Sequence, residues 1–370
     1  MILREHVPLA PLTTLGLGGP ARWFATCGSL EEVREAFRLA RSRRLRTAVI
    51  GGGSNLIVPD EGFDGLVIAM NLRGITARQD GDHLLVTAAA GEPWDEFVSH
   101  TVEHGWGGLE CLSGIPGLVG ATPIQNVGAY GQEVSETIAR VEVMDQETLD
   151  RRTLPPEVCA FGYRTSAFKA GGIREVIVTG VTFRLRPNGA PTVTYPELQR
   201  HVESSTAGHT LPGGAEGLHA VRRAVLQLRR RKSMVVDPAD PHTRSAGSFF
   251  TNPVLTPEAF EAAAAQWRKS GSAEPIPSYP VSGQSVGPAR GRAGAGGAGQ
   301  VKVSAAWLVE HAGFEKGFRE GGVGISANHA LALVNYGGTT EALLALAARI
   351  QTTVRERFGI PLEREPVVLQ

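Results

Sequence analysis

The sequence has few cysteines, no excess of either charge and no long apolar run. Its 370 residues include three cysteines, Cys27, Cys111 and Cys159. An odd number of well-separated cysteines without paired ligand spacing argues against a disulfide framework and against a zinc site. We interpret these cysteines as buried, reduced thiols, and we predict no metal site.

Charge and hydropathy exclude further classes of protein. Lysine plus arginine and aspartate plus glutamate both number 37, and this balance argues against nucleic acid or an anionic membrane as the main partner. A balanced net charge is still compatible with a local basic pocket for a phosphate. No apolar run approaches the roughly 18–20 residues needed to cross a bilayer, and residues 1–7 lack the apolar stretch of a signal peptide. We expect a cytoplasmic protein with a small-molecule partner.

The chain is long enough for two or three domains of mixed secondary structure. Helices are predicted at 30–43, 93–104, 217–232, 257–267 and 341–358, and strands at 45–50, 65–70, 139–144, 175–185 and 362–369. Ser29 and Glu32 have capping-box spacing, and Thr256 with Pro257 is typical of a helix start. The pattern is an α/β arrangement of alternating short elements.

A stretch dominated by glycine, alanine and serine occupies residues 283–299. We interpret it as a flexible surface loop. A phosphate-binding loop there would need a strand before it and a helix after it, and the strand is missing.

A second glycine-rich segment, Gly51 to Leu56, directly follows a predicted strand. Glycines let backbone N–H groups approach a pyrophosphate closely, and Ser54 and Asn55 can add side-chain hydrogen bonds. A tight turn between two strands is an equally good reading. The spacing differs from the dinucleotide pattern GxGxxG and no helix opens after it, which disfavours a Rossmann domain.

The segment 115–131 is long, rich in glycine and nearly uncharged. Such a loop must satisfy its backbone polar groups, and wrapping a large planar cofactor would do so, with Gln125 and Asn126 as directional donors and acceptors. A purely structural loop of this length would be unusual.

Five motifs in order carry a resemblance over nearly the whole chain. They are GGGSN, IPGLVGATPIQNVGAYG, FGYRTSAFK, AGSFFTNPV and LERE. Together they resemble the UDP-N-acetylenolpyruvoylglucosamine reductase family, also called MurB. The stretch TYPEL at 194–198 is similar to the substrate-binding tyrosine loop of one subclass.

The resemblance implies an FAD-binding domain of the vanillyl-alcohol-oxidase (PCMH) type in two subdomains, followed by an α+β substrate domain. We expect residues 1–74 with 359–370 in the first subdomain, 75–222 in the second, and 223–358 in the substrate domain. The residues expected to hold FAD are Gly51, Gly52, Gly53, Ser54, Asn55, Leu56, Ala121, Thr122, Gln125 and Gly128.

The resemblance also implies the reaction: reducing equivalents pass from NADPH through FAD to the enolpyruvyl group of a UDP-sugar, giving UDP-N-acetylmuramate. Arg164 would bind the substrate carboxylate, because a guanidinium fork suits bidentate carboxylate binding. Ser248 would protonate the α-carbon, and Glu365 would help to polarise the enolate. Pro366 stands where the family commonly has valine, which puts local strand pairing in doubt.

The substrate itself is expected to contact a further group of residues. These are Tyr163, Tyr195, Arg230, Lys232, Asn252 and His329. Lys232 and a neighbouring arginine, Arg229 or Arg230, would meet the pyrophosphate as a local positive patch. The RRRK run is otherwise typical of a solvated helix end, and a lone histidine such as His329 is as often structural.

Two alternatives stay open. Another FAD-dependent oxidoreductase of this fold, such as an alcohol or sugar-lactone oxidase, predicts a histidine or cysteine for covalent flavin attachment near Gly51–Asn55. None is close in sequence, although Cys27 and His104 stay candidates. A nucleotide-sugar binding protein without catalysis predicts loss of Arg164, Ser248 or Glu365, and all three are present. The family also suggests a monomer.

Overall fold

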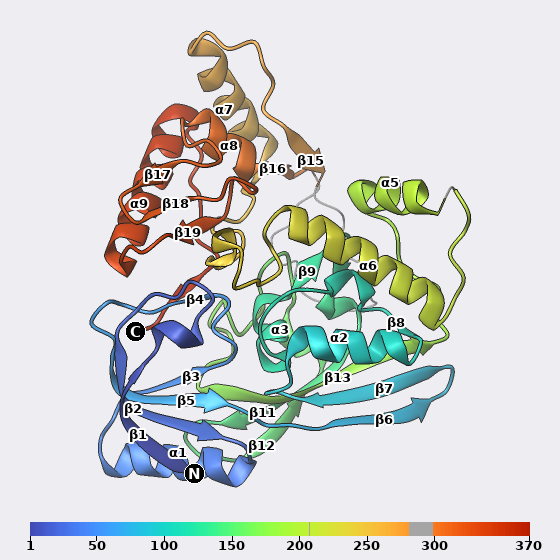
Figure 1. The fold of residues 1–370 in the computed structure, drawn as a ribbon, viewed down its shortest axis with the longest axis vertical. Coiled ribbons are helices and arrows are strands. Elements are labelled where there is room, and N and C mark those ends of the chain that lie inside the picture. Colours follow the sequence, from blue (N-terminus) through green and yellow to red (C-terminus); the bar gives the residue numbers. More distant parts are fainter. Residues whose placement is uncertain (207, 281–298) are drawn as a thin grey trace.

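The computed structural model describes residues 1–206, 208–280 and 299–370, which form an α+β protein (Figure 1). Two sheets occupy one end of the molecule, and a lobe made by the C-terminal part of the chain stands at the other. Apart from Gly299, the glycine-rich segment predicted as a flexible loop lies outside the described residues. None of the described helices has the length and apolar content needed to cross a bilayer.

The first sheet has four strands in the order β1-β2-β5-β3. They are β1 (Ile2–Pro8), β2 (Pro20–Cys27), β5 (Phe63–Met70) and β3 (Thr47–Ile50). Helix α1 (Leu30–Ser42) buries its apolar stripe against the sheet, and the Ser29 hydroxyl accepts from the Glu32 N–H at 3.2 Å. The predicted helix and both predicted strands are confirmed.

The second sheet is antiparallel, in the order β12-β11-β13-β7-β6. Its strands are β6 (Ile75–Asp80), β7 (His83–Ala89), β11 (Ile138–Asp145), β12 (Arg151–Leu154) and β13 (Val176–Pro187), with β8 (Trp106–Gly107) pairing the end of β13. Helices α2 (Trp94–Glu103) and α6 (Ala215–Arg231) pack together over it. The predicted strand at 175–185 is confirmed as its central strand β13.

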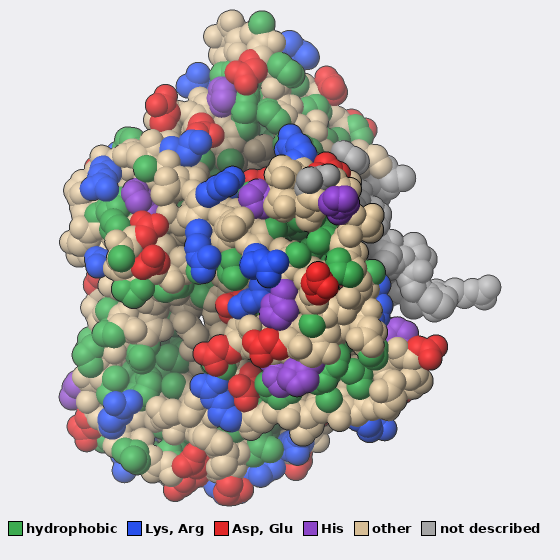
Figure 2. Space-filling view, turned by 45° about the vertical axis from the view of Figure 1, so that its right-hand side comes forward, with side chains coloured by type: hydrophobic (Ala, Val, Ile, Leu, Met, Phe, Trp, Pro, Cys, Tyr) green, Lys and Arg blue, Asp and Glu red, His purple; other side chains and the backbone are tan. Residues whose placement is uncertain are grey.

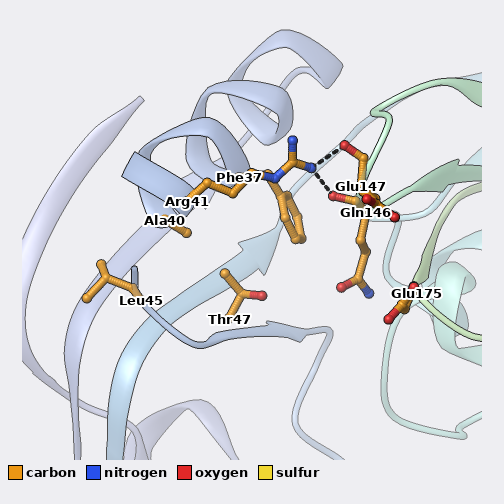
Figure 3. A pocket seen from close by; sticks show the side chains of 8 residues that line it. All are labelled: Phe37, Ala40, Arg41, Leu45, Thr47, Gln146, Glu147 and Glu175. Carbon is orange, nitrogen blue, oxygen red and sulfur yellow. Dashed lines mark hydrogen bonds between the residues drawn. The ribbon is translucent and has the colours of Figure 1, made fainter. Parts of the chain in front are cut away.

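The two sheets are joined through α1. Arg41 donates hydrogen bonds to the carbonyl oxygens of Gln146 and Glu147, at the turn between β11 and β12 (Figure 3). Below this contact Phe37 and Leu45 line a hollow of about 250 Å³. A cation at the last turn of one helix therefore links the two sheets.

The C-terminal lobe contains α7 (Pro257–Lys269), α8 (Ala305–His311) and α9 (Thr340–Phe358) around short strands. The strands are β14 (Val254–Leu255), β15 (Ser278–Pro280), β16 (Val301–Val303), β17 (Arg319–Glu320), β18 (Val323–Ile325) and β19 (Leu333–Asn335). The Thr256 hydroxyl accepts from the Ala259 N–H at 3.3 Å, which confirms the predicted start of α7. Leu15, Leu17 and Ile57 of the first sheet's loops join the core of this lobe.

The predicted strand at 362–369 is wrong over most of its length. Only β20 (Val367–Val368) pairs, in parallel with β4 (Leu56–Ile57), because Pro366 has no N–H with which to continue a ladder. Before the proline, the Glu365 N–H donates to the Phe249 carbonyl at 2.9 Å and the Thr251 N–H donates to the Glu363 carbonyl at 3.1 Å. The chain therefore changes partner at Pro366.

The segment 105–131 contains two 3-10 turns, Glu110–Leu112 and Val119–Ala121, and the single-turn helix α3 (Thr122–Gln125). Helix α5 (Pro196–Ser205) was not predicted, although its Pro196 stands at the first helical position. The three cysteines are free and buried, as expected, and burial raises the pKa of each thiol.

Candidate functional site

Two glycine-rich loops pack directly against each other. The Ser54 hydroxyl donates to the Pro116 carbonyl at 3.0 Å, and a Cβ on Gly52 would lie 2.8 Å from the Cα of Gly117. Gly53 has a φ of 63°, and a Cβ there would lie 1.9 Å from the Leu12 carbonyl oxygen. Side chains are excluded at these positions, so the surface presented is made of backbone.

A cavity of about 470 Å³ opens at the first of these loops. It is lined by Pro11, Leu12, Thr13, Thr14, Ile50, Gly51, Gly52, Ala69, Val236, Asp237, Pro238, Thr243 and Arg244. Its size lies within the roughly 300–1,000 Å³ of small-molecule sites. Glycine backbone, threonine hydroxyls and an arginine together fit the pyrophosphate of a dinucleotide such as FAD.

The remaining residues expected to hold the cofactor lie in β4 and in the segment 115–131. Leu56 lies in β4, Ala121 is exposed, and the Thr122 hydroxyl donates to the Val119 carbonyl at 2.8 Å. Gln125 accepts from Lys169 at 3.3 Å, and Gly128 lies in the two-residue strand β9 (Gly128–Ala129).

Two asparagines named for the cofactor use their side chains within the protein. The buried Asn126 amide donates to Glu133 at 2.8 Å and to the Gly162 carbonyl at 2.9 Å. The Asn55 amide donates to the Glu365 carbonyl at 3.2 Å. These side chains order the loops and leave the loop backbone to face a ligand.

Arg164 and Glu365 meet at the edge of the same loops. Arg164 Nε lies 3.4 Å from Glu365 Oε1, and an Arg164 Nη donates to the Gly128 carbonyl at 2.7 Å. Arg164 has a φ of 53° in a tight turn closed by reciprocal backbone bonds between Gly162 and Thr165. A non-glycine residue in this left-handed conformation is typical of a functional position.

Ser248 lies on a short extended segment between two backbone partners. Its neighbour Phe249 donates to the Leu331 carbonyl at 2.7 Å and accepts from the Glu365 N–H at 2.9 Å. Gly247, before it, has a φ of 71° and open space where a Cβ would stand. The backbone therefore places Ser248 next to Glu365, whose carboxylate contacts Arg164.

Tyrosines form one wall beside this group. Tyr130 and Tyr195 meet edge to face with ring centroids 5.6 Å apart, and Lys302 Nζ lies 5.1 Å from the Tyr163 ring centroid. Burial raises the pKa of Tyr163, while neighbouring Arg164 and hydrogen bonds from Asn252 lower it. Asn252 also accepts from the Ala305 N–H at 2.9 Å, which fixes its side chain.

The end of α6 supplies the cations. Lys232 Nζ lies 2.7 Å from Glu197 Oε2 and 5.9 Å from the Tyr130 ring centroid. Arg229 is half-buried and donates to the Met234 carbonyl at 2.7 Å, and its buried Nε has no hydrogen-bond partner among the described residues. Burial lowers the pKa of Arg229 to about 10. Arg230 is exposed, so of the arginines weighed from the sequence it is Arg229 that points inward.

His329 stands close to these cations. Burial, followed by the charges of Lys232 and Arg229, lowers the pKa of His329 to about 4. Its Nδ1 accepts from the Leu331 N–H at 3.1 Å, which suits a neutral ring. Figure 2 shows Lys and Arg side chains gathered across the middle of the face that carries α6.

Reductases of other bacteria are similar in sequence to this chain over nearly its whole length. UDP-N-acetylenolpyruvoylglucosamine reductase from Thermobifida fusca (strain YX) is 46% identical over 369 residues, covering 99% of this chain and 97% of that protein. The chain belongs to the UDP-N-acetylenolpyruvoylglucosamine reductase family. The protein of the same name from Mycobacterium tuberculosis (strain ATCC 25177 / H37Ra) is 43% identical over 380 residues, covering 99% of this chain and 95% of that protein.

Domain and structure comparisons agree with membership in this reductase family. Residues 21–148 match an FAD binding domain, and residues 238–369 match the C-terminal domain of UDP-N-acetylenolpyruvoylglucosamine reductase. The crystal structure of UDP-N-acetylenolpyruvylglucosamine reductase (MurB) from Thermus caldophilus is 25% identical, with a TM-score of 0.64 and 100% of both chains covered. The predicted FAD-binding fold with a separate C-terminal domain is confirmed.

Several residues of this reductase site were missed by sequence reasoning. Tyr130 lies inside the quoted motif, and Glu197 inside TYPEL, but neither was singled out. Lys302 lies in the three-residue strand β16, where it stands in register with Tyr279 of β15. The alternation Val301-Lys302-Val303, apolar on both sides of one cation, was the signal for a strand with one face toward the site.

Proposed function

We propose that this protein is an NADPH-dependent FAD enzyme that reduces UDP-N-acetylglucosamine enolpyruvate to UDP-N-acetylmuramate, a step of peptidoglycan precursor synthesis. Membership in the reductase family supports the reaction. The observation that carries the proposal for this chain is the contact of Arg164 with Glu365, next to the glycine-rich loops and to Ser248.

The loops at 51–56 and 115–128 would hold FAD. The backbone of Gly51 to Gly53 and the hydroxyls beside it suit the pyrophosphate, since no side chain obstructs an approach to their N–H groups. When bound, FAD supplies the carrier that takes reducing equivalents from NADPH and delivers them to the substrate. The buried Asn126 keeps the second loop in the shape that the cofactor requires.

Arg164 would bind the enolpyruvyl carboxylate and stabilise the negative charge that develops beside it. Glu365 orients the guanidinium through the 3.4 Å contact and would assist in polarising the enolate. Ser248 would donate its hydroxyl proton to the α-carbon. A serine is a weak acid, so this role depends on close placement against a strongly basic carbanion.

The nucleotide would lie along the tyrosine wall. Lys232 and the inward-facing Arg229 supply positive charge for the pyrophosphate, whereas the exposed Arg230 has a weaker claim. Tyr195 would cover the nucleotide beside Tyr130. Tyr163 and Asn252 would then contact the sugar, and His329 would act as a neutral donor next to the cations. We add Lys302 and Tyr279 to this set because of their position in the structure.

The division of the chain is also a proposal. Helix α6 runs unbroken through residues 222 and 223 and packs on α2 and α5, so we place the end of the second FAD subdomain after Arg231 rather than at 222. We further propose that the protein is a monomer. It would act in the cytoplasm, where its nucleotide-sugar substrate is made.

The test uses the purified protein with its visible spectrum. NADPH oxidation is followed with and without the enolpyruvyl sugar nucleotide. We expect a flavin spectrum and oxidation that depends on the sugar nucleotide. A colourless protein that cannot bind FAD would end the proposal, and oxidation of NADPH at the same rate without the sugar nucleotide would favour an oxidase.

A further inference from the structure

Lys232, the cation proposed for the pyrophosphate, already has an anionic partner. Its Nζ lies 2.7 Å from Glu197 Oε2, and the two side chains are 35% and 32% exposed. Glu197 lies in the first turn of α5, two residues after Tyr195, and Lys232 caps the end of α6. The pair therefore joins the segment that carries Tyr195 to the end of the helix that supplies the cations.

The carboxylate stands among residues assigned to the substrate. Glu197 contacts Lys232, whose Nζ lies 5.9 Å from the Tyr130 ring centroid, so the carboxylate lies beside the tyrosine wall. Its charge also adds to burial in raising the pKa of both Tyr130 and Tyr195. A pyrophosphate approaching Lys232 would meet Glu197 as a like charge. The N–H of Lys232 that donates to Glu197 cannot at the same time donate to the pyrophosphate.

Two roles for Glu197 are compatible with this contact, and they predict opposite effects of its loss on nucleotide affinity. An anchoring carboxylate would hold Lys232 in place, and its loss would weaken nucleotide binding. A competing carboxylate would have to be displaced, and its loss would strengthen binding. About a third of each side chain is exposed, so water reaches the pair. This favours the second role, because an ion pair accessible to water is weak and exchanges readily for a ligand of higher charge.

We infer that Glu197 is an internal competitor for Lys232, displaced by the pyrophosphate of the nucleotide, and that it lowers the affinity of this end of the site for anionic ligands. The inference rests on the proposed function. A diphosphate offers more than one negative charge and replaces the carboxylate, whereas an uncharged nucleoside gains nothing from Lys232. Glu197 thereby lowers the affinity for a diphosphate that binds Lys232 and leaves the affinity for an uncharged nucleoside unchanged.

The test compares Glu197→Gln with wild type as FAD-loaded proteins, using UDP and uridine as probes in titration calorimetry. We expect UDP to bind about three- to fivefold more tightly to Glu197→Gln at low ionic strength, as loss of a half-exposed ion pair implies. Uridine binding should not change. The gain should shrink as salt is added, because screening weakens the freed charge.

Two controls give the result its meaning. Glu203→Gln removes an exposed carboxylate from the same helix and should leave UDP binding unchanged. In a Lys232→Ala background the gain from Glu197→Gln should disappear. Unchanged or weaker UDP binding by Glu197→Gln, or a gain that persists without Lys232, overturns the inference. Turnover of the enolpyruvyl sugar nucleotide by the wild type tests the proposed function separately, since that result does not depend on Glu197.

Discussion

Arg164 Nε lies 3.4 Å from Glu365 Oε1, although the two residues belong to segments far apart in the chain. The arginine is also fixed by a hydrogen bond to the Gly128 carbonyl and by the turn from Gly162 to Thr165. The protein thus occupies Nε and one Nη donor of the guanidinium, and the remaining N–H donors are left for a substrate carboxylate.

This geometry predicts that Arg164→Lys is not a conservative change. Lysine offers a point charge in place of a planar fork, so it cannot keep both the Glu365 contact and a bidentate contact to substrate. We expect kcat for substrate reduction to fall by about 10²- to 10³-fold, the range for loss of a donor to developing charge. Arg200→Lys, at an exposed position of α5, is the control. Steady-state kinetics with near-normal activity for Arg164→Lys would contradict the assignment.

Ser248→Ala should separate the two halves of the reaction. Reduction of the flavin by NADPH should be nearly intact, whereas reoxidation by the enolpyruvyl substrate should slow by about 10²- to 10⁴-fold, as expected for loss of a general acid. Stopped-flow absorbance of the flavin measures both rates, with Ser204→Ala on α5 as the control. If both rates fell together, Ser248 would have a structural role instead.

Gly52→Ala should weaken FAD binding. The added Cβ would lie 2.8 Å from the Cα of Gly117, which forces the two loops apart, and overpacking of this kind costs about 1–3 kcal/mol. Fluorescence titration of the apoprotein with FAD measures the change in Kd. Gly172→Ala, where the nearest atom would be 3.6 Å from the Cβ, is the control. Equal FAD affinity for both variants would show that the loop contact is unimportant.

His329 should make folding stability depend on pH. Its pKa is lowered to about 4 in the folded protein, mainly by burial, so below pH ~6.5 the unfolded chain takes up the proton first. The free energy of unfolding should therefore fall as the pH falls from about 6.5 to 4, by up to about 3 kcal/mol from this residue. Denaturant unfolding measured at several pH values should show that the free energy of unfolding depends less on pH in His329→Gln than in the wild type. In His209→Gln the dependence should equal that of the wild type. Parallel curves for wild type and His329→Gln would refute the effect.

The elements predicted well from the sequence are those whose patterns are local. The helix after Ser29 and the strand at 175–185 each carry a complete cap or a run of β-branched residues, and both are confirmed. The prediction of a terminal strand at 362–369 was wrong because the pairing of this segment changes at Pro366, and its partners lie far away in the sequence. Nothing within residues 362–369 specifies that partner.

The candidate site shows the same limit at the level of single side chains. Adjacent positions in a helix point about 100° apart, so the choice between Arg229 and Arg230 depends on how α6 is rotated against its neighbours. The motif alone could not decide it. Lys302 was missed because the alternation around it spans only the three residues of β16, too few to distinguish a strand from a loop.

Glu365 is anchored next to the glycine-rich loop, since its carbonyl accepts from Asn55 and β20 pairs with β4. It is also the last residue of the proposed site to be synthesised. On a translating ribosome the loops of the cofactor site are complete long before this carboxylate emerges. Nascent chains can therefore acquire flavin-binding loops while still lacking the partner of Arg164, and we expect reductase activity only once β20 has paired with β4.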